Sequence, residues 1–104
     1  MVLRHATPAR NLNSILRLGL LRSYSRGKLP VVWACCPAKT WWAALHVIRR
    51  HGGRVESTVV LEIDVPRSWL RRSRKGLWYC PRDIRPKRIR RVLTFQELAA
   101  CPAA

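Results

Sequence analysis

The sequence predicts one α+β domain over residues 1–104, with small mixed or antiparallel sheets and two main helices. Two segments repeat apolar residues at helical spacing, and five shorter ones carry the alternating or β-branched patterns of strands. Their order is strand, helix, strand, helix and then three strands, which favours α+β over a strictly alternating architecture. Five tryptophans and a hydrophobic content of 48% are enough to form one core.

The first strand and the first helix meet at a histidine. The first apolar run ends in His5-Ala6-Thr7, and a segment with helical periodicity follows it. We expect Thr7 to cap this helix and Gly19 to end it. A histidine at a strand end, beside a helix start, brings a ring nitrogen and backbone donors to one pocket, which predicts a site for a polar ligand. The alternative is a histidine that only bonds to the backbone. The predicted apolar face of the helix comprises Leu12, Ile15 and Leu16.

A second strand is expected over residues 29–35, which are rich in β-branched and aromatic side chains. Pro37 can open the second helix, and Gly52-Gly53 can end it. His46 and His51, on its polar flank and at its end, are expected to have surface or capping roles. Its predicted buried face comprises Trp41, Ala44, Leu45 and Ile48.

Three more strands are expected, over residues 57–65, 76–80 and 90–95, with a turn or short helix at 66–72 and a frayed turn at 96–101. The first of these strands alternates, so Glu62 and Asp64 share its polar face. Two carboxylates on one strand face could act as general acid and base if that face lined a pocket. The alternative is a solvent-facing surface whose acids pair with arginine.

The chain carries 21 Lys and Arg against 5 Asp and Glu, a formal net charge of +16. This imbalance predicts a polyanionic partner: RNA or single-stranded DNA first, and an acidic protein such as an antitoxin second. The basic residues are densest over residues 67–91, where Trp69 and Trp78 interleave with them, although we expect these two rings to pack in the core. The candidate nucleic-acid contacts are Arg26, Arg54, Arg71, Arg72, Arg74, Lys75, Arg88 and Arg91.

Cys35, Cys36, Cys80 and Cys101 lack the paired spacing of zinc sites and disulfide scaffolds, so free thiols and no metal site are predicted. Free thiols are typical of a reducing cytoplasm, which is the expected location. No apolar run is long enough to span a bilayer, so we expect no membrane partner.

Several short motifs occur in a defined order between residues 2 and 95. They are His5-Ala6-Thr7, Asn11-Leu12 with Ser14-Ile15-Leu16 and Gly19-Leu20, then Val32-Trp33-Ala34-Cys35, Val59-Val60-Leu61-Glu62-Ile63-Asp64, Lys75-Gly76-Leu77-Trp78 and residues 83–89. Together they resemble the ADP-ribosyltransferase-like fold, which includes toxin and DNA-modifying branches and the RNA 2'-phosphotransferases.

The resemblance implies NAD as cofactor, with His5 and Trp33 as catalytic residues, and we add Glu62 as a third catalytic candidate. Trp33 stands where the family has tyrosine or histidine. Leu77 stands where the transferases have the glutamate that orients the ribose 2'-hydroxyl, and Glu62 is our candidate substitute for that acid. The implied cofactor-binding residues are His5, Ala6, Thr7, Arg10, Asn11, Trp33 and Leu77.

Three functions follow from the resemblance. The first is an ADP-ribosyltransferase-like enzyme that binds NAD or a ribose-phosphate ligand and acts on a nucleic-acid or other acidic target. The second is an inactive protein of this fold that binds nucleic acid as part of a ribonucleoprotein. The third is an RNA 2'-phosphotransferase-like activity, which the hydrophobic Leu77 favours. Whether the protein is a toxin or a housekeeping factor stays open.

Overall fold

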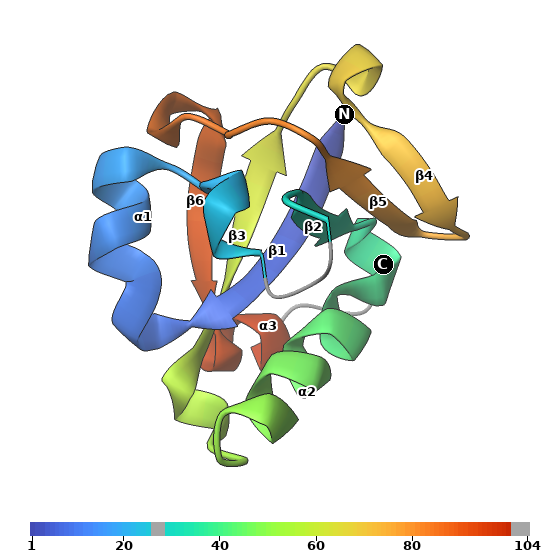
Figure 1. The fold of residues 1–104 in the computed structure, drawn as a ribbon. Helices are drawn as coiled ribbons and strands as arrows, with labels where there is room; N and C mark the ends of the chain where they lie inside the picture. Colours follow the sequence, from blue (N-terminus) through green and yellow to red (C-terminus); the bar gives the residue numbers. More distant parts are fainter. Residues whose placement is uncertain (26–28, 101–104) are drawn as a thin grey trace.

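The computed structural model describes residues 1–25 and 29–100, and within them the chain forms one antiparallel six-stranded sheet with helices on both faces (Figure 1). The strand order across the sheet is β4-β5-β2-β1-β3-β6. The strands are β1 (Val2–Pro8), β2 (Val32–Cys35), β3 (Thr58–Asp64), β4 (Arg71–Arg74), β5 (Leu77–Cys80) and β6 (Ile89–Thr94). The helices are α1 (Leu12–Leu18), α2 (Thr40–Arg50) and α3 (Phe95–Ala100), and single 3-10 turns are η1 (Ala9–Asn11), η2 (Arg22–Tyr24), η3 (Pro37–Lys39), η4 (Val55–Ser57), η5 (Arg67–Trp69) and η6 (Pro86–Arg88).

The α+β class and the two main helices are confirmed, but the described strands join in a single sheet and all pair antiparallel. Two elements differ from the prediction. The segment predicted as a turn or short helix does contain the turn η5, but the strand β4, which was not predicted, begins within it at Arg71. The predicted frayed terminal turn is the helix α3. The Thr94 side chain caps α3: the Glu97 amide donates to the Thr94 hydroxyl (3.2 Å), which in turn donates to the Glu97 carboxylate (3.2 Å).

Helices cover both faces of β3, so the prediction of a polar outer face was wrong. Ile15 of α1 belongs to one buried cluster together with Leu61 and Ile63 of β3. On the opposite face, Ala44 of α2 belongs to a second buried cluster with Val60. All residues of β3 except Asp64 are buried.

The start of α1 differs from the prediction, and its end matches it. Thr7 does not cap the helix: it lies buried within β1, and no side-chain hydrogen bond caps η1 or α1. Leu16, predicted on the apolar face, is exposed. Gly19 ends the helix with a positive φ of 89°, and a Cβ at this position would collide with the carbonyl oxygen of Ile84.

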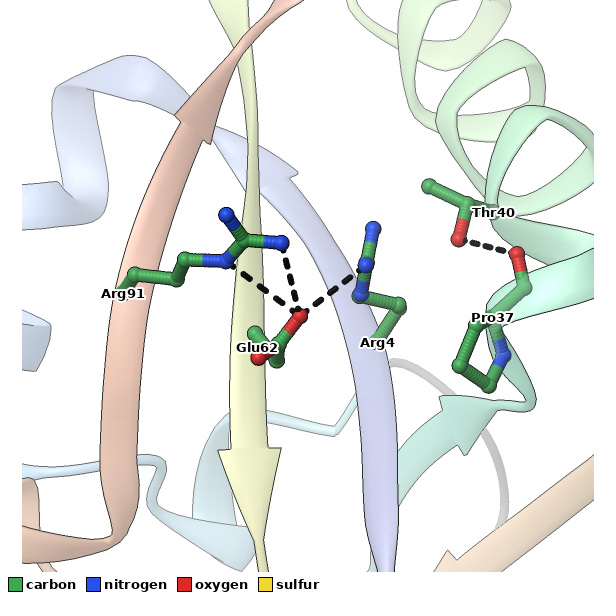
Figure 2. Close-up of polar contacts among 5 residues, drawn as sticks. All are labelled: Arg4, Pro37, Thr40, Glu62 and Arg91. Atoms are coloured by element: carbon green, nitrogen blue, oxygen red, sulfur yellow. Dashed lines mark hydrogen bonds and ion pairs between the residues drawn. The ribbon is translucent and has the colours of Figure 1, made fainter. Parts of the chain in front are cut away.

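The buried stripe of α2 comprises Thr40, Ala44 and Ile48. Leu45, predicted to share it, is exposed, because a stripe with a strict four-residue repeat leaves Leu45 on the flank of the helix. The Thr40 hydroxyl donates to the carbonyl of Pro37 (2.6 Å), which joins η3 to the first turn of α2 (Figure 2). As predicted, the helix ends at the glycine pair, where the Gly53 amide donates to the Ile48 carbonyl (2.7 Å).

The sheet divides into two halves between β1 and β2. Strands β1 and β3 pair along their whole length, from Val2 opposite Asp64 to Pro8 opposite Thr58. Strands β1 and β2, in contrast, pair only where Arg4 lies opposite Cys35. The strands therefore diverge beyond Arg4, and this divergence positions the candidate site.

Candidate functional site

A cleft of about 820 Å³ opens where β1 and β2 diverge. Its walls are β1, β2, the first helix and the exposed flank of α2. This volume is within the range of small-molecule and cofactor sites, about 300–1,000 Å³. The cleft exists because β1 and β2 share only one residue pair. Continued pairing would hold the two strands side by side and close the space between them.

His5 bridges the two sides of the cleft. Its Nδ1–H donates to the carbonyl oxygen of Trp33 on β2 (2.6 Å), an assignment that follows because a carbonyl can only accept. Burial lowers the pKa of His5 below its ordinary value, and the bond to the Trp33 carbonyl opposes this effect only in part. The neutral ring then carries its lone pair on Nε2, and no other described residue forms a hydrogen bond with that atom. The histidine thus combines both readings of the sequence: it bonds to the backbone and also lines the cleft.

Most of the implied cofactor-binding residues line this one cleft. They are His5, Ala6, Thr7, Asn11, Trp33 and Leu77. Arg10 is the exception: it lies on the exposed η1 turn and donates from Nη2 to Nδ1 of His51 (3.2 Å), which does line the cleft.

The lining of the cleft carries positive charge without negative charge. Exposed Arg50 lines it together with Arg4, whose charge is paired with Glu62, and none of the described lining residues is aspartate or glutamate. Cys35 also lines it, but burial raises the pKa of its thiol to about 11, so it is a poor nucleophile at neutral pH. This environment suits an anionic ligand.

Glu62 does not lie in the cleft, so its proposed role as substitute acid is not supported. It is buried on β3 between arginines of the two neighbouring strands (Figure 2). Arg4 contacts its carboxylate at 2.9 Å and Arg91 at 3.3 Å. The three side chains form a row because Arg4 and Arg91 are the register partners of Glu62 on β1 and β6. The pairing with arginine is thus confirmed, in a buried rather than a solvent-facing position.

The candidate nucleic-acid residues do not form one surface. Arg71, Arg72 and Arg74 are exposed on β4, whereas Arg91 lies on β6, and these strands are the two opposite edges of the sheet (Figure 1). Exposed Lys75 follows β4, exposed Arg54 precedes η4, half-buried Arg88 belongs to η6, and Arg26 lies outside the described residues.

The tryptophans of the basic segment pack against the core, as predicted. Their rings also carry arginine guanidinium groups. Arg82 lies 4.5 Å and Arg88 5.0 Å from the Trp69 ring centroid, and Arg67 lies 5.6 Å from that of Trp78. These stacks occupy part of the ring surface that a base would need.

Sequence reasoning missed the contribution of α2 to the cleft. Trp42, His46, Arg50 and His51 all line it, and Trp42 contacts His46 in a T-shaped, edge-to-face arrangement with ring centroids 4.4 Å apart. The signal was present in the helical spacing: Trp42, His46 and Arg50 repeat every four residues, two positions after the buried stripe.

Comparison with known proteins adds no relative, because no protein-family model and no curated protein matches the chain. Among residues 1–25 and 29–100, no helix has the length and apolar character needed to cross a membrane.

Proposed function

We propose that the chain is an ADP-ribosyltransferase-like protein that binds NAD or a related ribose-phosphate ligand in the cleft. The observation that carries this proposal is the position of His5, which is held by Trp33 with Nε2 available as an acceptor. A neutral Nε2 accepts a hydrogen bond from a ribose hydroxyl and has no proton to offer a phosphate. His5 would therefore hold the sugar.

The remaining lining fits the other parts of such a ligand. Arg50 is exposed at the cleft and would bind a phosphate, and the aromatic faces of Trp33 and Trp42 would contact a base. NAD would supply an activated glycosidic bond. The fit to NAD is incomplete, however, because a carboxylate that would stabilise the positive charge developing at that bond is absent from the described lining.

A second candidate is the RNA 2'-phosphotransferase-like activity. It is favoured by the same cationic lining and by Leu77 at the position where the transferases have glutamate. Basic residues suit a substrate phosphate. If neither reaction occurs, the cleft would serve ligand binding alone, as expected for an inactive protein of this fold.

Ligand binding tests the proposal directly. NAD, ADP-ribose and a 2'-phosphorylated RNA are titrated by calorimetry into the native protein and into His5→Asn. The asparagine amide can still donate to the Trp33 carbonyl but does not replace Nε2, so the strand contact is kept while the ligand acceptor is lost. One lost hydrogen bond of about 0.5–1.5 kcal/mol weakens binding by roughly 2–12-fold.

The control is Arg17→Gln, which removes an exposed charge on α1 outside the lining of the cleft. Turnover is followed in parallel, as nicotinamide release from NAD and as phosphate transfer from the RNA. Absence of binding for all three ligands, or equal affinity of the native protein and folded His5→Asn, would contradict the proposal.

A further inference from the structure

A second hollow, of about 180 Å³, adjoins the cleft. Trp42 and Leu77 line both cavities, so the two share a boundary. The residues of the smaller one, which we call the basic pocket, come from the β4–β5 hairpin, η3 and α2. They are Lys39, Trp42, Arg74, Lys75, Gly76 and Leu77.

The two walls of the basic pocket are fixed to each other at Gly76. The Cys36 amide, just before η3, donates to the Gly76 carbonyl (2.9 Å). Gly76 has a positive φ of 78°, and a Cβ there would lie only 3.0 Å from Cγ of Lys39. The aliphatic part of Lys39 therefore packs against the turn that carries Lys75, which keeps these cations near each other.

The three cations of the basic pocket are not neutralised by carboxylates. The described lining contains no aspartate or glutamate, and Lys39, Arg74 and Lys75 form no ion pair with a described residue. Four of the five acids have partners elsewhere: Glu62 with Arg4 and Arg91, Asp64 with the Met1 amine, Asp83 with the Arg22 amide and Glu97 with Thr94. Bringing three like charges together favours an anion between them.

Trp42 adds an aromatic surface to this charge. Trp42 is 45% exposed, and the edge contact with His46 holds one side of its ring. Trp69, by comparison, is covered by two arginines. Trp42 is thus better placed than the tryptophans of the basic segment to receive a base.

We propose that the basic pocket binds single-stranded nucleic acid, with a backbone phosphate held by Lys39, Arg74 and Lys75 and a base stacked on Trp42. Cations beside an exposed ring are the combination that single-stranded nucleic acid requires, whereas an acidic peptide requires the cations alone. The nucleic acid would then pass Leu77, which lines both cavities, and reach the cleft. That the bound nucleic acid is also the target of a reaction in the cleft rests on the proposed function. That the nucleic acid binds in the basic pocket does not.

The test measures the affinity of a fluorescein-labelled single-stranded RNA of about 12 nucleotides by anisotropy at several salt concentrations. The pocket variant replaces Lys39, Arg74 and Lys75 by glutamine. A matched control removes equal charge from exposed positions elsewhere, as Arg17→Gln, Arg49→Gln and Arg90→Gln combined. Circular dichroism confirms that both variants fold.

We expect the pocket variant to reduce the log–log salt slope by roughly 0.7, since its three cations hold one phosphate and each phosphate contact contributes roughly 0.7 on a single strand. The control should leave the slope close to native. Trp42→Ala should weaken binding roughly tenfold with little change in slope, because a stacked base releases no counterion. Equal losses of RNA affinity and salt slope in the pocket variant and its control would overturn the proposal. So would displacement of the RNA by polyglutamate, if Trp42→Ala also binds the RNA with native affinity.

The same proteins are titrated with NAD. The pocket variant should bind it like the native chain, and His5→Asn should keep the native RNA slope. A native chain that binds neither NAD nor ADP-ribose but shows the expected RNA results would count against an NAD-type ligand in the cleft and still support the basic pocket.

Discussion

Replacing Glu62 by glutamine separates a structural from a catalytic role for the acid that was proposed to substitute for the missing transferase glutamate. In the structure, one oxygen of Glu62 forms an ion pair with Arg4 and accepts hydrogen bonds from Arg91 (Figure 2). The side chains of Glu62 and Arg4 are only 10% and 15% exposed, whereas that of Arg91 is 55% exposed. The two contacts should therefore differ greatly in energy.

The magnitude follows from this asymmetry. Removing one partner of a buried ion pair costs about 3–5 kcal/mol, because the other charge stays buried and unpaired. Arg4 already has a buried Nε without a partner among the described residues, so it cannot easily recover the lost contact. We expect Glu62→Gln to cost about 3 kcal/mol, which lowers Tm by roughly 12–24 °C in a domain of this size. Arg91→Gln should cost less than about 1 kcal/mol, because it removes the exposed contact.

Thermal unfolding by circular dichroism measures both variants in about 150 mM salt, which screens the change in net charge. Binding and turnover of NAD and 2'-phosphorylated RNA are measured well below the variant's Tm, where Glu62→Gln should behave like the native protein. An unchanged Tm together with lost turnover would refute the reasoning and restore Glu62 as a catalytic residue.

Three further outcomes can be checked. Burial lowers the pKa of His5 below 6.5, so the neutral ring stabilises the fold fully above pH 6.5, and this stabilisation is lost as the pH falls below 6.5. Tm should therefore drop more from pH 7 to pH 5 in the native chain than in His5→Asn. Gly19→Ala should lower the urea midpoint far more than Gly52→Ala, because both have positive φ but only Gly19 faces a backbone oxygen that a Cβ would strike. Iodoacetamide at pH 8 should label half-buried Cys36 before buried Cys35, whose pKa of about 11 leaves about a thousandth as thiolate; tandem mass spectrometry of the peptide distinguishes them.

The sequence predicted those elements that have an apolar periodicity. Strands β1 and β3 and helix α2 lie close to their predicted positions because runs or repeats of apolar residues mark each of them in the sequence. Strand β4 could not be found in this way, since all four residues of Arg71–Arg74 are exposed and only pairing with β5 makes them a strand. Its charged side chains are typical of a protected sheet edge.

The sequence predicted the candidate site only in part. The resemblance to the ADP-ribosyltransferase-like fold predicted that His5 and Trp33 share one site, and both line the cleft. Alternation put Glu62 on the face opposite Leu61, but it could not reveal that helices cover this face as well. Nor could charge counting reveal that β4 and β6 would end up on opposite edges of the sheet.

The central position of β1 has a consequence for folding during synthesis. Except for Leu77, all residues that line the cleft lie between Arg4 and His51. The strand that holds β1 in place is β3, which is made only afterwards, and such non-local pairing is slow to form. A nascent or truncated chain that stops before Thr58 would therefore carry almost every binding residue and still have no cleft.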